Sequence, residues 1–68
     1  MISYEPFWKT LKEKKVSTYT LTKKLNVSTG TLSRMKNGRN ISTHTINELC
    51  KLLDCKVDDI LIYISDDE

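Results

Sequence analysis

A set of apolar residues spaced for two short crossing helices constrains this chain more than any other feature. The five positions are Leu21, Leu25, Val27, Leu32 and Met35. The first two fit one helix face, the last two fit another, and Val27 lies between the pairs; the intervening residues are polar or small. Two helices joined by a tight turn would bury these side chains against each other. The spacing therefore predicts a helix-turn-helix over about residues 18–37.

Residues that favour helix ends stand where this motif needs them. Ser17 and Ser28 are suited to cap the starts of two helices. Asn26 tolerates the left-handed conformation that a turn requires, and Asn37 is followed by Gly38, a common helix ending. These residues predict one helix reaching Leu25 and a second ending at Asn37.

Two further helices are expected on either side of the motif. A helix over about residues 5–14 has Phe7, Trp8 and Leu11 at helical spacing, with Pro6 tolerated in its first turn. Another helix begins after Ser42 or Thr43, and its apolar stripe comprises Ile46, Leu49, Cys50 and Leu53. The chain has one Pro and two Gly, which favours helices throughout.

The segment from Val57 to Tyr63 admits two interpretations. Asp58 and Asp59 suit the first turn of a fifth helix, whose core-facing residues would be Val57, Ile60, Leu61 and Ile64. The β-branched and aromatic run 60–64 is also compatible with a strand. Since no other strand is expected, that strand would pair only with its copy in a dimer. Residues 65–68 are expected to form a frayed acidic tail.

The length and composition predict a single all-α domain over residues 1–68 and disfavour several functions. A chain of 68 residues is too small for a deep catalytic cleft, so no enzyme is expected. His44, Cys50 and Cys55 are too few for a structural zinc site, so neither a metal nor another cofactor is expected. No apolar stretch approaches the roughly 20 residues that cross a bilayer, and no basic leader precedes one. The expected location is the cytoplasm, with both thiols reduced.

Charge is distributed unevenly along the chain. Residues 1–40 hold nine Lys or Arg and two Asp or Glu, a net charge of +7. Residues 41–68 hold two Lys and seven Asp or Glu, a net charge of −5. A polyanion is therefore attracted to the first part and repelled by the second.

Two stretches of this sequence resemble the Cro/phage-repressor (XRE-like) helix-turn-helix family. They are residues 16–38, VSTYTLTKKLNVSTGTLSRMKNG, and residues 45–61, TINELCKLLDCKVDDIL. The resemblance is greatest to small stand-alone bacterial regulators. It implies a compact five-helix, lambda-repressor-like domain that binds operator DNA, controls transcription and often dimerises. The chain departs from the family pattern at four positions: Thr18 replaces a common Gln, Thr22 an Ala, Asn26 a Gly and Lys36 an acidic residue.

In this mode of docking, the start of the second motif helix meets base edges in the major groove. The candidate base contacts are Arg34, Thr29, Ser33, Ser28 and Gly30. Arg34 could donate two hydrogen bonds to a guanine or instead hold a phosphate, and Ser28 serves mainly as a helix cap. Gly30 has no side chain with which to read a base. The candidate phosphate contacts are Thr18, Asn37, Arg39, Asn40 and Lys36.

The main alternative is a protein-interaction module, such as an antitoxin-like protein or an adaptor, that uses the same fold. The apolar segment 60–64 would then supply its interface. In the DNA-binding interpretation, the same segment is a candidate surface for a homodimer. No small-molecule partner and no membrane contact are expected.

Overall fold

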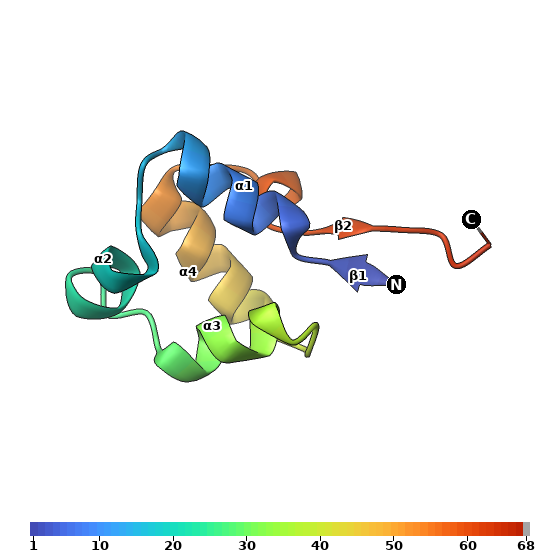
Figure 1. Ribbon diagram of the computed structural model, residues 1–68, viewed down its shortest axis with the longest axis horizontal. Coiled ribbons are helices and arrows are strands. Elements are labelled where there is room, and N and C mark those ends of the chain that lie inside the picture. Colours follow the sequence, from blue (N-terminus) through green and yellow to red (C-terminus); the bar gives the residue numbers. More distant parts are fainter. Residues whose placement is uncertain (68) are drawn as a thin grey trace.

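The computed structural model describes residues 1–67 and contains four α-helices (Figure 1). The helices are α1 (Glu5–Glu13), α2 (Thr18–Lys23), α3 (Thr29–Lys36) and α4 (Thr43–Leu53). A single 3₁₀ turn, η1 (Val57–Asp59), follows them, and two short strands, β1 (Ile2–Ser3) and β2 (Ile62–Tyr63), form a ribbon. In Figure 1 the ribbon projects sideways from the helices, away from α2. None of the helices in residues 1–67 has the length and apolar character needed to cross a membrane.

Serine side chains cap three of the helices. The Oγ atom of Ser17 accepts a hydrogen bond from the Thr20 N–H at 3.1 Å, and that of Ser28 accepts one from the Gly30 N–H at 3.0 Å. Ser42, rather than Thr43, caps α4 in the same way. The expected N-caps at Ser17 and Ser28 are therefore confirmed, and each is worth about 1 kcal/mol.

Each α-helix is followed by a residue in the left-handed conformation. The φ angles are 56° at Lys15, 59° at Asn26, 68° at Gly38 and 49° at Asp54. Asn26 and Gly38 were expected there from their residue types, whereas Lys15 and Asp54 were not. The tight turns that these residues make allow four short helices to fold back on one another.

The helix predicted to reach Leu25 ends at Lys23. The Leu25 N–H bonds the Thr20 carbonyl, and the Val27 N–H bonds the Leu21 carbonyl at 2.8 Å. These hydrogen bonds span five and six residues, instead of the four of an α-helix, and they form the turn that contains Asn26.

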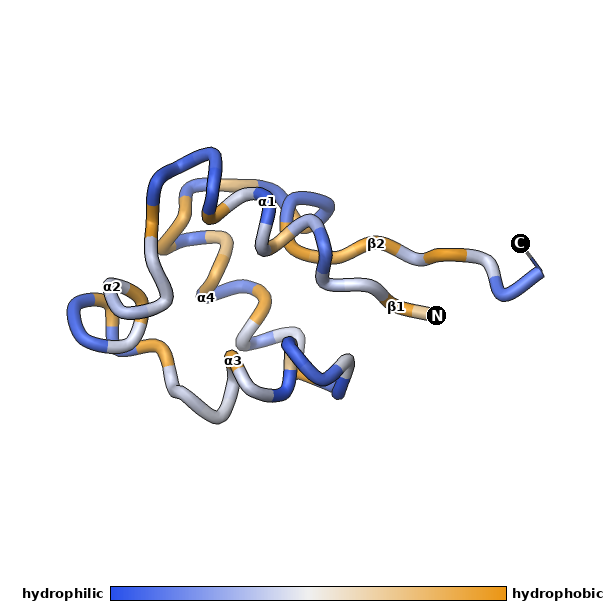
Figure 2. Tube along the Cα trace, in the orientation of Figure 1, coloured by the Kyte–Doolittle hydropathy of each residue, from blue (hydrophilic) through white to orange (hydrophobic). Residues whose placement is uncertain are grey.

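All four α-helices and the segment after η1 contribute to the core. Its buried apolar residues are Tyr4, Phe7, Leu11, Leu21, Leu32, Met35, Leu49, Leu53 and Ile60. Leu25 and Val27 are half-buried and pack against this core, so all five motif positions contact it as the spacing predicts. Trp8 is also only half-buried, with its ring edge against Phe7 at 4.9 Å between centroids. Figure 2 shows that the apolar residues of β2, in contrast, lie out on the ribbon.

The prediction of a fifth helix over Val57–Tyr63 is wrong. Only η1 is helical there, and the Asp59 carboxylate accepts the Lys56 N–H at 2.9 Å at its start. The chain then extends as β2, which pairs antiparallel with β1, Ile2 opposite Tyr63. A strand here was expected to pair only with a second copy, and that is also wrong because residues 2–3 supply the partner. The fold is therefore mostly helical with a two-stranded sheet, not the all-α, five-helix domain predicted from the sequence.

The change at the C-terminal segment also alters which of its side chains are buried. Ile60 is fully buried and Leu61 half-buried, as expected, but Val57 is 56% exposed and Ile64 is 38% exposed. Within the tail that was expected to fray, Asp66 accepts a hydrogen bond from the Met1 amino group at 3.2 Å. Residue Glu68 lies outside the described residues.

Two buried polar side chains hold distant segments together. The Tyr4 hydroxyl donates to the Arg39 carbonyl at 2.7 Å, and the Thr10 hydroxyl donates to the Asp59 carbonyl at 2.8 Å. The first bond fastens the loop after α3 to the N-terminal segment, and the second fastens η1 to α1. Each bond satisfies a backbone carbonyl of a loop and thereby fixes the position of that loop.

Candidate nucleic-acid interface

The helix α3 has one buried face and one exposed face. Thr31, Leu32 and Met35 are buried, which fixes the orientation of the helix on the core. The opposite face presents the predicted base-contact residues, of which Ser28, Thr29, Ser33 and Arg34 are exposed and Gly30 is partly exposed. Because both sets repeat at helical spacing, the predicted contact residues gather on one surface.

Arg34 is held against its own helix. Its Nη2 atom donates to the Thr31 hydroxyl at 3.2 Å. A Cβ atom added at Gly30 would lie 3.3 Å from the Arg34 Nη1 atom and 3.3 Å from the Ser28 Oγ atom. The missing side chain of Gly30 therefore leaves the space in which the guanidinium lies. Thr31 is not among the site residues predicted from the sequence, although its position three residues before Arg34 on a helix allows such a contact.

The candidate phosphate contacts fall into two groups. Thr18 and Lys36 line a shallow groove together with the base-contact candidates Thr29 and Ser33. Three other exposed residues follow α3, namely Asn37, Arg39 and Asn40. The Asn37 amide nitrogen already donates to the Ser33 carbonyl at 2.9 Å and to the Ser33 hydroxyl at 3.5 Å, so this amide is engaged within α3.

Tyr4 acts on this surface from the far end of the sequence. Its hydroxyl holds the Arg39 carbonyl, so the backbone of the loop after α3 has a defined position. Nothing in the sequence alone predicts a role for Tyr4 at this surface. A buried tyrosine requires a partner for its hydroxyl, but the residue type does not reveal which carbonyl that partner is.

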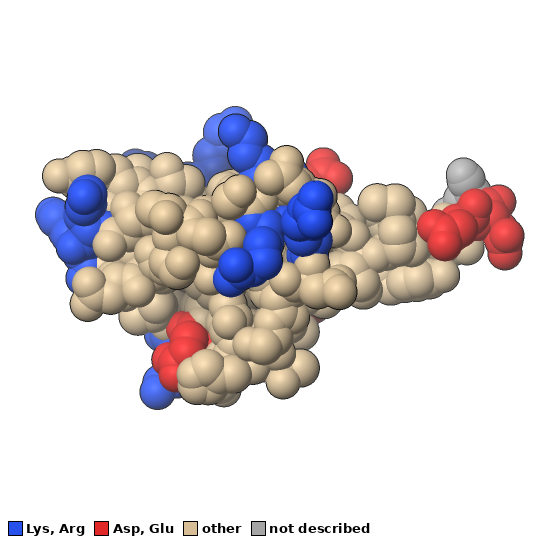
Figure 3. All heavy atoms as spheres, turned by 90° about the horizontal axis from the view of Figure 1, so that it is seen from below, with Lys and Arg blue, Asp and Glu red and all other residues tan. Residues whose placement is uncertain are grey.

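The electrostatics of this side of the molecule favour an anion. Between Glu13 and Glu48 the chain carries seven Lys or Arg residues and no acidic residue. Figure 3 views the protein from the side on which α3 lies, and Lys and Arg are spread over this face while Asp and Glu stand at its margins. The acidic tail is at the end of the ribbon (Figure 3). A polyanion is therefore attracted to the α3 face and repelled from the ribbon tip.

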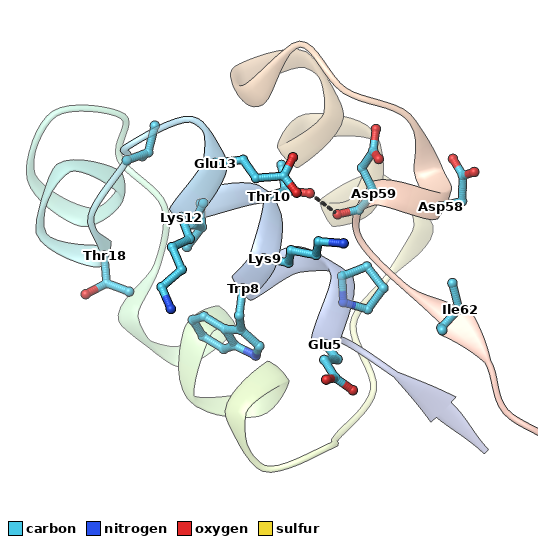
Figure 4. A pocket seen from close by; sticks show the side chains of 13 residues that line it. Glu5, Trp8, Lys9, Thr10, Lys12, Glu13, Thr18, Asp58, Asp59 and Ile62 are labelled. Carbon is cyan, nitrogen blue, oxygen red and sulfur yellow. Dashed lines mark hydrogen bonds between the residues drawn. The ribbon is translucent and has the colours of Figure 1, made fainter.

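A second groove, along the outer side of α1, has a different character. Figure 4 shows Glu13 and Asp59 on one side of it, Asp58 further out and Glu5 near the start of α1. Lys9 extends from α1 toward this acidic side in the same view. The mixture of charges makes this groove a poor site for a polyanion.

Within residues 1–67, the Cys, His, Asp and Glu side chains form no group of three or more that could hold a metal ion. Cys50 and Cys55 are free and half-buried, and His44 lies 3.8 Å from the Glu48 carboxylate on the exposed side of α4. Burial raises the pKa of the Cys55 thiol to about 11, and the neighbouring Cys50 and Asp59 add to this effect. A thiol with so high a pKa is a weak nucleophile at neutral pH.

Comparison with known proteins agrees with this geometry. The Cro/C1-type HTH DNA-binding domain matches residues 7–66. The crystal structure of the transcriptional regulator VanUg, form II, superposes with a TM-score of 0.83 at 25% sequence identity, covering 96% of this chain and 87% of that one. No curated protein sequence matches this chain. The match over residues 7–66 shows that the chain belongs to the family of Cro/C1-type helix-turn-helix DNA-binding domains.

Proposed function

We propose that this protein binds double-stranded DNA sequence-specifically and regulates transcription, with α3 in the major groove. The exposed face of α3 supports this most directly, because it offers Arg34 and three hydroxyl side chains and no carboxylate. The VanUg protein, similar over nearly its whole length, is a transcriptional regulator. Repression is the simplest outcome for so small a domain, since occupying an operator excludes other proteins from it.

In this proposal Arg34 makes the main sequence-specific contact with a DNA base. Its guanidinium can donate two hydrogen bonds to the O6 and N7 atoms of guanine, which discriminates by about 1–3 kcal/mol. Thr29 and Ser33 offer a hydroxyl each, and the Thr29 methyl suits a thymine methyl. Ser28 remains a cap, because its oxygen accepts the Gly30 N–H. Gly30 does not contact a base in this proposal; its lack of a side chain leaves room for the Arg34 guanidinium.

Phosphate contacts would surround this reading face. Thr18 and Lys36 stand on one side of α3, while Asn37, Arg39 and Asn40 follow its C-terminal end. Such contacts set the register of the protein on the duplex without carrying sequence information. They also make binding dependent on salt.

Selection from a pool of random duplexes at about 0.15 M salt, a concentration at which non-specific binding is weakened, tests the proposal. We expect one motif to be enriched, and we expect Arg34→Ala to relax the preference at one base pair of that motif. If Arg34→Ala weakens all duplexes equally, Arg34 holds a phosphate instead. Enrichment of no motif would overturn sequence-specific binding and favour the protein-interaction role.

We also propose that two copies associate through the ribbon. Met1, Ile2, Ile62, Tyr63 and Ile64 are all at least 38% exposed there. A lone two-stranded ribbon with apolar side chains on both faces is marginal in water and gains stability when covered. The ribbon lies along the 40 Å long axis of the molecule and projects from the helices (Figure 1), so its apolar side chains are accessible to a second copy.

A further inference from the structure

We propose that Cys50 and Cys55 form a modification site, at which a hydroperoxide closes an intramolecular disulfide between α4 and the segment that leads into η1. Both thiols are free and half-buried, and both pack against the hydrophobic core. They lie on either side of the turn that ends α4. The site is separate from the exposed face of α3 and does not depend on DNA binding.

The turn after α4 brings the backbones of the two cysteines together. Asp54 has a left-handed φ of 49°, and its N–H bonds the Lys51 carbonyl at 3.4 Å. The Cys55 N–H bonds the Cys50 carbonyl at 3.1 Å. These two hydrogen bonds form a Schellman motif, in which the side chains of the residues joined by the wider bond commonly contact each other. In this chain both of those residues are cysteines.

The wider hydrogen bond also limits how far apart the two cysteines lie. With ordinary bond lengths, an N–H···O bond of 3.1 Å keeps their Cα atoms within about 7 Å, and disulfides usually join Cα atoms about 4.4–6.8 Å apart. Burial is the main cause of the raised pKa of the Cys55 thiol, but Cys50 contributes through its charge and through a hydrogen bond between the two side chains. The two sulfur atoms are therefore close enough for small side-chain rotations to join them.

The surroundings of Cys55 decide which thiol reacts first. Burial, Cys50 and Asp59 raise its pKa to about 11, whereas Lys14 acts in the opposite direction. Because Cys55 is therefore a weak nucleophile, Cys50 is the thiol whose thiolate attacks the hydroperoxide.

The reaction has two steps. The Cys50 sulfur bonds the terminal oxygen of the hydroperoxide, the O–O bond breaks, and the other oxygen leaves as an alcohol after taking up the thiol proton. The Cys55 sulfur then displaces the hydroxyl of the Cys50 sulfenic acid, which leaves with the Cys55 proton as water. Two thiols and one hydroperoxide thus give one disulfide, one alcohol and one water.

The disulfide would fasten α4 to the chain that follows it. Cys50 lies on α4, and Cys55 precedes η1, which Thr10 of α1 holds through the Asp59 carbonyl at 2.8 Å (Figure 4). Closing the bond restricts the unfolded chain and so favours the folded state. Because a thiol of high pKa leaves slowly, another thiol that attacks the Cys50 sulfur would release Cys55 slowly.

Treatment of the reduced full chain with hydrogen peroxide tests the proposal. We expect the monomer to lose two hydrogen atoms by mass spectrometry and to regain them with a thiol reductant. Trypsin cleaves after Lys51, between the two cysteines, so only a disulfide keeps their peptides joined. The Tm of the oxidised protein should rise by about 4–8 °C. In Cys55→Ser, Cys50 should instead accumulate as a sulfenic acid, which dimedone labels.

The matched control moves one thiol by a single position. Cys50→Ser with Lys51→Cys keeps two thiols in the same turn but removes one of them from the pair joined by the wider hydrogen bond. This variant, once its thermal unfolding shows that it is folded, should close a disulfide at least about tenfold more slowly than the wild type.

Three outcomes would overturn the proposal. Equal rates in the wild type and the control would show that closeness in sequence, rather than the turn, governs the reaction. Disulfide-linked dimers as the only product would show that the two thiols do not meet within one chain. Oxidation of Cys50 to a sulfinic acid while Cys55 stays reduced would show that the pair is only an apolar contact.

Discussion

Gly30 illustrates how much a single residue can matter when it has no side chain. Glycine inside a helix is unfavourable by about 1 kcal/mol relative to alanine, so α3 is less stable for carrying it. The Arg34 guanidinium lies beside Gly30, 3.3 Å from the place where a Cβ atom would be, and its Nη2 atom donates to the Thr31 hydroxyl. Gly30 therefore lowers the stability of α3 slightly, and it leaves room for the guanidinium of Arg34, the main candidate for a base contact.

Gly30→Ala should therefore separate stability from recognition. We expect the free energy of unfolding to rise by up to about 1 kcal/mol, which is about 4–8 °C in Tm for a domain of this size. The added Cβ would lie 3.3 Å from the Arg34 Nη1 atom, so the guanidinium must shift by a few tenths of an ångström, and the preference at the base that Arg34 contacts should weaken. Thermal unfolding and duplex selection on the same protein measure the two effects.

A control and a double variant sharpen this prediction. Asn47→Ala, at an exposed position of α4, should stabilise the protein without altering base preference. In an Arg34→Ala background, Gly30→Ala should have no further effect on base preference. A normal preference in Gly30→Ala alone would show that Arg34 reaches DNA from another position.

Cys55 should make stability depend on pH above neutrality. Burial raises the pKa of its thiol from 9.0 to about 11, so the folded protein favours the neutral form. The unfolded thiol ionises at lower pH, and this contribution to stability is complete below about pH 9 and is lost between about pH 9 and 11. Denaturant unfolding of the wild type and of Cys55→Ala across this range should show a steeper decline for the wild type. Parallel curves would show that the folded thiol ionises like the unfolded one.

At the scale of elements, the end of α1 carries a conformational penalty. Lys15 has a φ of 56°, a left-handed conformation that costs an ordinary residue about 1 kcal/mol. At the end of α3 the same conformation is adopted by Gly38, for which it is unstrained. The two helix ends thus use one geometry at different cost.

Lys15→Gly should therefore stabilise the protein by about 0.5–1 kcal/mol, as measured by denaturant unfolding. The neighbouring residue provides the matched control, because Lys14 has an ordinary φ of −88°. Lys14→Gly makes the same chemical change and should destabilise the protein or leave it unchanged. Equal effects at the two positions would contradict the assignment of strain to Lys15.

At the scale of the whole molecule, charge and apolar surface are separated. The cationic face of α3 lies away from the ribbon tip, where Asp66 and Asp67 are found (Figure 3). The exposed apolar residues of the ribbon lie near that acidic tip. DNA and a second copy of the chain would therefore use different surfaces and would not compete.

The ribbon proposal predicts an effect of charge on association. Ile62→Lys with Tyr63→Lys should abolish a dimer that sedimentation equilibrium detects for the wild type, with and without a duplex carrying two half-sites. Val57→Lys is the control, because Val57 is also exposed but lies in η1, outside the ribbon. A wild type that remains monomeric on such a duplex would refute association through the ribbon.

The sequence alone determined the features that depend on local spacing. The motif residues Leu21, Leu32 and Met35 are buried as their periodicity predicts, and the caps at Ser17 and Ser28 are formed. Helical periodicity and capping involve residues within a few positions of each other, so a sequence displays them directly. The same local pattern was sufficient for the resemblance to the family that the comparison confirms.

Only the tertiary structure decided the features that join distant residues. The run 60–64 has both apolar and β-forming character, and its conformation depends on whether a partner strand is present. That partner is Ile2–Ser3, some 60 positions away, and no local pattern announces it. The same holds for the Tyr4 bond to Arg39 and for the shallow groove beside α3, which Trp8 and Tyr19 also line. The helix-turn-helix follows from local spacing, whereas the ribbon and the groove arise only when segments far apart in sequence pack together.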